Sequence, residues 1–221
     1  MTLLLLLAAA YAALMLWRYG RRGWLAIAPS TVRIRSREDR EPRTPAQAQA
    51  GAALSALGFR RLGSRDEEGP IGGGLGLRSD AWANEGERAY ADVYEDAARP
   101  GVPARLQLLT GFPDGALALT ANFPRAPRAG PSLEVGGFPD ASVQATWEAH
   151  RRAVARLSAR HGVPAPATGL PARDALARAW YRGPGGAELR RRFAVYLGNA
   201  LLAALILGAA LSMLWRNRAA P

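Results

Sequence analysis

The chain has 221 residues, with 29 arginines, no lysine, no cysteine and a formal net charge of +11 at pH 7. Without cysteine, thiolate nucleophiles and cysteine-ligated zinc sites are excluded. Such a charge would suit a nucleic acid, but eight of the arginines lie beside two apolar runs at the chain ends, so we expect no nucleic-acid partner.

Residues 2–17 form the first apolar run and a candidate transmembrane helix. These 16 uncharged residues would span about 24 Å as a helix, which is short for a hydrocarbon core of ~30 Å. A secretory signal peptide has a similar length, but it begins with basic residues, and none precedes this run. We therefore predict a retained span over 2–17, followed by a charged linker over 18–43.

The predicted central domain, 44–162, begins with a helix. Thr44, Pro45 and Gln47 form a capping box with proline at the first helical position, and Gly58 is suited to end the helix. The glycine-rich stretch 69–76 lacks the Gly-Lys-Ser/Thr of a phosphate-binding loop, so it predicts a turn.

Segments that alternate apolar and polar residues, separated by turn residues, predict the strands. They are residues 59–62, 75–82, 88–95, 105–110 and 116–123. Because the connections are short, we expect an antiparallel meander of four or five strands. Residues 124–139 contain several Pro and Gly and predict an irregular loop.

A second helix should begin after Asp140 and end before Gly162, with an apolar stripe that includes Trp147, His150 and Leu157 and covers the sheet. Residues 163–189 are predicted to hold a juxtamembrane loop and a short helix over 172–181, with Leu176 and Trp180 toward the membrane surface. The fold class is therefore α+β, with transmembrane helices at both ends enclosing one domain, in which two helices pack on the antiparallel meander.

The second apolar run, 193–215, has 23 uncharged residues and is long enough to span a bilayer. Small residues recur on it at every fourth position and predict a ridge for packing against the first span, another membrane protein or a second copy. They are Ala200, Ala204, Gly208 and Ser212. Chance spacing in an alanine-rich run explains the ridge equally well.

Arginines beside the two runs predict the orientation, because short arginine-rich loops remain in the cytoplasm. The boundary residues on the domain side are Arg18, Arg21, Arg22, Arg190, Arg191 and Arg192. Together with a composition typical of a GC-rich bacterial genome, they predict a multi-pass protein of the bacterial inner membrane, with a cytoplasmic central domain and membrane lipids as partners.

His150 and His161 are the two histidines, and their spacing does not place both on one metal. We expect no metal and no cofactor. We interpret His150 as a neutral core histidine, and a catalytic pair of His150 with Asp92 or Asp114 is the alternative.

Polar residues of the hairpin around 111–115 could contact a ligand or partner, namely Asp114 in the turn and Thr120 and Asn122 on one strand face. The simpler interpretation is an exposed hairpin. No sequence motif identifies an activity, so the favoured hypothesis is a membrane-tethered binding or assembly module. A membrane-bound enzyme using His150, and a sensor of anionic lipid using Arg190–Arg192, stay open as alternatives.

Overall fold

The computed structural model describes residues 2–37, 44–69, 77–94 and 104–219. The chain divides into two compact units. The sheet unit comprises Ile34–Glu67 and Leu77–Ala177, whereas the helix-pair unit contains both chain ends, up to Arg33 and from Arg178 onward. Of the predictions above, the end of the linker (38–43) and most of the glycine-rich turn (70–76) lie outside the described residues.

The described strands form one eight-stranded mixed sheet in the order β1-β2-β3-β4-β5-β6-β8-β7. They are β1 (Arg33–Arg37), β2 (Arg60–Glu68), β3 (Leu77–Asn84), β4 (Ala89–Tyr94), β5 (Leu106–Gly111), β6 (Leu117–Ala121), β7 (Arg128–Ala129) and β8 (Leu133–Gly137). Strands β2 to β6 pair antiparallel with their neighbours, whereas β8 pairs parallel to β6.

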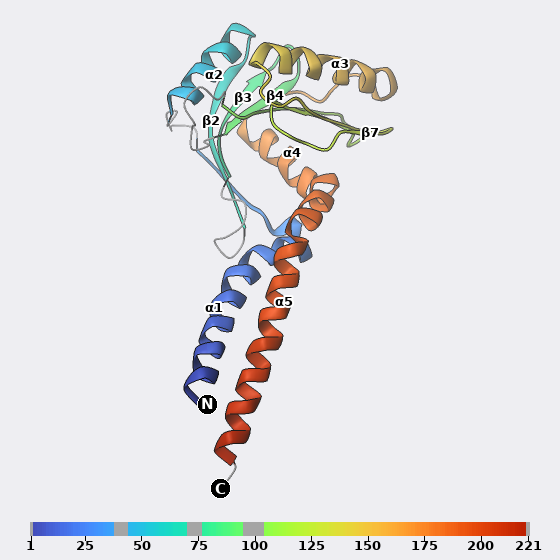
Figure 1. Cartoon of the computed structure of the whole chain (residues 1–221). Helices are drawn as coiled ribbons and strands as arrows, with labels where there is room; N and C mark the ends of the chain where they lie inside the picture. The colour runs from blue at the N-terminus through green and yellow to red at the C-terminus, as the bar shows by residue number, and fades with distance from the viewer. Residues whose placement is uncertain (1, 38–43, 70–76, 95–103, 220–221) are drawn as a thin grey trace. The chain divides into compact units, whose positions relative to one another are not determined.

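Helices cover both faces of this sheet (Figure 1). Helices α2 (Pro45–Ala56) and α3 (Val143–His161) pack on one face, where Leu54 and Trp147 meet Val93 of β4. The first half of α4 (Leu170–Arg182) packs on the other face, where Leu170 lies in a cluster with Tyr90. The alternation of side chains along β4 therefore supplies a separate core to each layer.

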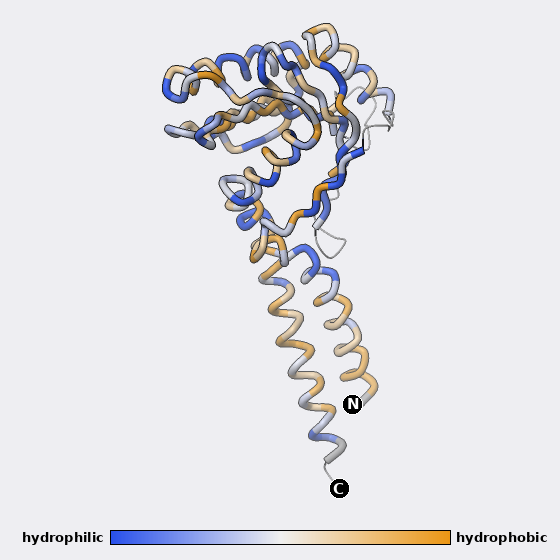
Figure 2. Tube along the Cα trace, turned by 180° about the vertical axis from the view of Figure 1, so that it is seen from behind, coloured by the Kyte–Doolittle hydropathy of each residue, from blue (hydrophilic) through white to orange (hydrophobic). Residues whose placement is uncertain are grey.

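The helix-pair unit consists mainly of α1 (Thr2–Ile27) and α5 (Pro184–Ala219), which lie side by side and antiparallel (Figure 1). Small residues fill the seam between them: Ala12, Ala200, Ala203 and Ala210 are buried, and Gly23 lies against the backbone of Leu197. Both helices are long and apolar enough to cross a membrane. Figure 2 shows the apolar character along most of both helices.

The α+β class and the two apolar terminal helices are confirmed, and the predicted strands form the meander β2 to β6. The sheet nevertheless has more strands than the four or five predicted, and it contains a parallel pair, β6 and β8. β7 and β8 lie in the stretch predicted as a loop, and β1 lies in the predicted linker. Strand β8 pairs parallel with β6, which no short turn signals, and its antiparallel neighbour β7 has only two residues and too short a pattern to predict a strand.

The helices differ from the prediction at two boundaries and in the packing of one side chain. α1 does not end with the apolar run at Trp17 but continues through Arg18, Arg21 and Arg22 to Ile27. α3 is capped by the hydroxyl of Ser142, not by Asp140, whose positive φ of 61° places it in the turn before the helix. Leu176 of α4 packs against the sheet beside Gly111, and not toward a membrane surface as expected.

Candidate functional site

A pocket of about 460 Å³ lies between α3 and the β6, β8 and β7 end of the sheet. Its apolar wall consists of Pro127, Ala129, Val135, Gly136, Phe138, Ala149 and Ala153. Its polar groups are Thr120, Arg128, Glu134 and Arg156. A mostly apolar lining with a few polar groups is typical of a site for a small molecule or an inserted side chain.

The parallel pairing of β8 with β6 shapes this pocket. Thr120 of β6 lies opposite Gly136 of β8, so no side chain from β8 covers the threonine at that position. The ring of Phe138 takes the free space, since a Cβ on Gly136 would lie 3.0 Å from its Cε2 atom. Phe138 is 44% exposed and therefore forms an accessible wall.

His150 lies behind Thr120 in the core. Its Nδ1 is 3.0 Å from the hydroxyl oxygen of Thr120, and its Nε2 is 3.0 Å from that of Thr110. Complete burial lowers the pKa of His150 to about 3, so the imidazole is neutral, with one donor and one acceptor nitrogen. A threonine hydroxyl has one proton and two lone pairs. The hydroxyl of Thr120, which is 2% exposed, therefore keeps hydrogen-bonding capacity beyond its contact with His150.

An ion pair marks the charged side of the pocket. Arg156 of α3 donates from Nε and Nη2 to the two carboxylate oxygens of Glu134, at 3.0 and 2.6 Å. These hydrogen bonds lower the pKa of Glu134 below its ordinary value. The pair fixes both side chains in a planar fork and joins α3 to β8 beside the apolar wall.

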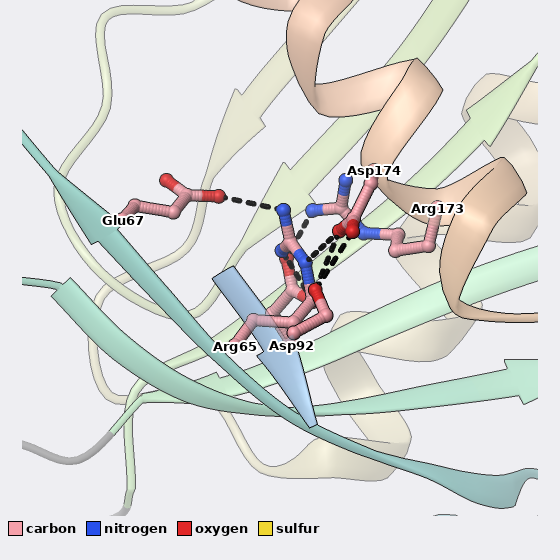
Figure 3. A network of polar contacts seen from close by, with 6 residues as sticks. Arg65, Glu67, Asp92, Arg173 and Asp174 are labelled. Atoms are coloured by element: carbon pink, nitrogen blue, oxygen red, sulfur yellow. Dashed lines mark hydrogen bonds and ion pairs between the residues drawn. The ribbon is translucent and has the colours of Figure 1, made fainter. Parts of the chain in front are cut away.

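The second polar feature is a buried ion cluster beneath α4 (Figure 3). Arg65 of β2 donates from Nε to Asp174 at 2.8 Å, from Nη2 to Glu67 at 2.9 Å and from Nη1 to Asp92 at 3.3 Å. Arg173 of α4 also donates to Asp92. The cluster thus ties α4 to two neighbouring regions of the sheet.

Burial alone would lower the pKa of Arg65, but the charges of Asp92 and Glu67 and the hydrogen bond to Asp174 outweigh it, and the pKa is raised. Each carboxylate that faces Arg65 is itself held by the arginine, and Asp92 is shared with Arg173. Groups locked in mutual ion pairs of this kind are suited to fixing an element in place. We therefore assign the cluster a structural role.

The structure does not bring the predicted catalytic candidates His150 and Asp92 together. Asp92 lies opposite Gln107 in the register of β4 and β5, while His150 contacts Thr110, three residues further along β5. Side chains three residues apart on a strand point to opposite faces. His150 therefore belongs to the α3 face of the sheet, and Asp92 to the α4 face.

The three residues of the predicted ligand face have different surroundings. Thr120 lines the pocket. Asn122 is buried and holds backbone groups, accepting from Leu106 N at 2.6 Å and donating to Ala104 O at 2.9 Å. Asp114 lies outside the pocket lining and pairs with Nδ1 of His161 at 2.5 Å.

The predicted membrane-boundary arginines all belong to the helix-pair unit. The guanidinium of Arg21 lies over the ring of Trp17, and that of Arg22 over Tyr196, both at 5.3 Å from the ring centroid. Arg18, Arg190, Arg191 and Arg192 are exposed.

The predicted ridge of small residues on α5 is divided by the pairing with α1. Ala200 is buried in the seam, whereas Ala204, Gly208 and Ser212 are exposed. Association of a further helix with these three residues stays a prediction.

Sequence reasoning missed most of the pocket. Glu134 and Phe138 fall in the stretch predicted as an irregular loop, and Arg156 lies outside the apolar stripe predicted for its helix. The available signal was the alternation around Thr120, which predicted the strand face on which Thr120 lies. It did not predict that α3 packs over that face. For the ion cluster, the signal was a charged residue, Asp92, between two tyrosines on a strand.

Within the described ranges, no group of three or more His, Asp or Glu side chains is placed to hold a metal ion. No family model matches the chain, and neither a curated protein nor a solved structure does.

Proposed function

We propose that this chain is a protein of the bacterial inner membrane that crosses the bilayer with α1 and α5 and holds its sheet unit in the cytoplasm as a binding or assembly module. The pocket beside α3 is the proposed binding site. Tethering to the membrane would raise the effective concentration of the module toward a membrane partner.

The outward surface of the helix pair is the observation that carries the membrane assignment. Leu4 and Leu205 are 71% and 72% exposed, and large apolar side chains continue along both helices. An aqueous protein does not leave an apolar surface of this length uncovered, whereas a bilayer solvates it. The arginines on the domain side support the cytoplasmic orientation.

The pocket supports binding in preference to chemistry. His150 is not among the lining residues, and both of its ring nitrogens face threonine hydroxyls. A neutral imidazole with this arrangement orients Thr120 but has no path for a proton to the pocket except through that hydroxyl. A polar group of a ligand beside Thr120, with its apolar part against Phe138, would suit the lining.

Cysteine labelling tests the orientation, because the chain has no cysteine of its own. We would compare the single variants Ala159→Cys on α3 and Asn217→Cys near the end of α5, both at exposed positions. In intact spheroplasts, a membrane-impermeant maleimide should label Asn217→Cys at once and Ala159→Cys only after lysis. Labelling of Ala159→Cys in intact cells, or removal of the protein from membranes by alkaline carbonate, would refute the proposal.

Photo-crosslinking in cells tests the pocket. A benzophenone amino acid at Phe138 should give a discrete adduct, whereas the same group at Val163, which is 61% exposed and does not line the pocket, should not. The same adducts from both positions, or none from Phe138, would argue against a binding role for this pocket.

A further inference from the structure

The two chain segments that leave the helix pair meet at one point. Pro29 begins the short 3-10 turn η1 (Pro29–Thr31) after α1, and Gly186 lies in the first turn of α5. A Cβ on Gly186 would lie 3.2 Å from Cγ of Pro29 and 2.4 Å from the carbonyl oxygen of Tyr181. The close approach fixes η1, the end of α4 and the start of α5 to one another.

Three exposed arginines flank this contact in the sequence, each four residues from one of its two partners. Arg33 follows Pro29 by four residues, Arg182 precedes Gly186 by four, and Arg190 follows it by four. Four residues extend at most about 14 Å, so the Cα of each arginine lies within that distance of Pro29 or Gly186. Arg178, Arg191 and Arg192 are exposed as well and lie further along α4 and α5. We call these six residues the arginine collar.

The collar is not neutralised by the protein. Within the described residues, no carboxylate forms an ion pair with Arg33, Arg182 or Arg190. In contrast, Arg60, Arg61 and Arg156 of the sheet unit each pair with a carboxylate within 2.7 Å. In the stretch 178–192, Glu188 is the single acidic residue.

Aromatic residues lie at the same end of the helix pair. The ring centroids of Tyr19 and Tyr196 are 6.3 Å apart. Trp24 lies in the last turn of α1 and is 41% exposed. Tyr and Trp prefer the level of lipid headgroups. If α1 and α5 span the membrane, the collar is held at the depth of the lipid phosphates.

We propose that the arginine collar binds the phosphate groups of anionic phospholipids, of which phosphatidylglycerol is the representative probe. This inference rests on the membrane placement proposed above. A guanidinium donates two parallel hydrogen bonds to a phosphate, and several guanidiniums around one point accommodate an anionic headgroup better than a zwitterionic one, whose own ammonium group repels them.

Native mass spectrometry of the full chain in mixed micelles tests the collar, with phosphatidylglycerol or phosphatidylcholine titrated in parallel. The wild type should retain phosphatidylglycerol preferentially. The variant Arg33→Gln, Arg182→Gln, Arg190→Gln should bind it more weakly by about fivefold for each arginine removed, or on the order of a hundredfold in total. Its unfolding temperature should not change, because these side chains have no described partner to lose.

The matched control removes the same charge from α3, with Arg151→Gln, Arg152→Gln and Arg160→Gln at exposed positions. Equal retention of both lipids, or equal losses in the two triple variants, would overturn the collar. If inorganic phosphate or soluble glycerophosphate, at the same concentration as the lipid, displaced phosphatidylglycerol, the collar would bind free phosphate and the proposal of a lipid ligand would be wrong. If any of these results comes from a protein that resists carbonate extraction, the collar proposal is wrong but the proposed membrane placement is not affected. Extraction by carbonate would instead remove the membrane placement itself.

Discussion

The hydroxyl of Ser36 lies 2.9 and 2.8 Å from the two carboxylate oxygens of Asp174, 138 residues further along the chain. Ser36 belongs to β1, which follows α1, and Asp174 belongs to α4, which precedes α5. Asp174 also accepts from Arg65 in the sheet. The segments that lead to the two apolar helices are therefore joined to each other and to the sheet through one polar cluster.

Asp92→Asn should destabilise the protein strongly. The substitution removes the negative charge that Arg65 and Arg173 share in a fully buried position, and breaking such a pair costs about 3–5 kcal/mol. Chemical unfolding in detergent, followed by tryptophan fluorescence, measures the change. Glu85→Gln is the control, because its ion pair with Arg60 is largely exposed and should contribute about 1 kcal/mol at most. Equally small losses in both variants would contradict the structural role of the cluster.

The stability of the protein should fall with decreasing pH through His150. Its pKa is about 3 in the folded chain and about 6.5 in the unfolded chain, so between these values the unfolded state alone takes up the proton. The contribution of His150 to the unfolding free energy should thus decrease by up to ~1.4 kcal/mol per pH unit as the pH falls from 6.5 toward 3. In His150→Gln this component of the slope should vanish. An unchanged slope would show that the imidazole is protonated in the fold.

His161 should titrate with a raised pKa, for which the carbonyl of Pro131 is the larger cause and the carboxylate of Asp114 the next. NMR of the imidazole signals measures it directly, since His150 stays neutral above pH 5. In Asp114→Asn the pKa of His161 should move down toward its ordinary value without reaching it, because the bond to Pro131 remains. A pKa that does not respond to this substitution would mean that the two side chains are apart in solution.

Gly23→Ala should loosen the helix pair. A Cβ at this position would lie 2.9 Å from the backbone of Leu197, which cannot yield, so α1 and α5 must separate. Gly20→Ala is the control, because nothing lies within 4 Å of its Cβ while the gain in helix propensity is the same. Disulfide formation between Tyr19→Cys and Tyr196→Cys reports the separation. It should slow in the Gly23→Ala background, and equal rates in the two backgrounds would disprove the close seam.

Features encoded within a few residues could be predicted from the sequence. Thr44 and Gln47 form the expected capping box, since both partners lie in one helical turn. The alternation over residues 88–95 predicted β4, in which Ala91 and Val93 face one core, because a strand's two faces follow from its period. The two apolar helices were evident from composition alone.

Features that depend on distant pairing could not be predicted. β8 lies beside β6 although a loop and β7 separate them in the sequence, and the pocket exists because of that pairing. The alternation that placed Thr120 and Asn122 on one face could not show that α3 would cover Thr120 or that Asn122 would bind the backbone. The partners of Arg65 lie up to 109 residues away, beyond any local pattern.

The long reach of the ion cluster also imposes an order on biosynthesis. Arg65, Glu67 and Asp92 leave the ribosome early, but Arg173 and Asp174 emerge only when α4 does, and Gly183 alone separates α4 from α5. The last closing contacts of the sheet thus become available just as the final hydrophobic segment is translated. A nascent chain stalled before α4 would hold an unfinished sheet, and completion of the sheet and emergence of the second apolar helix would occur in the same short interval of translation.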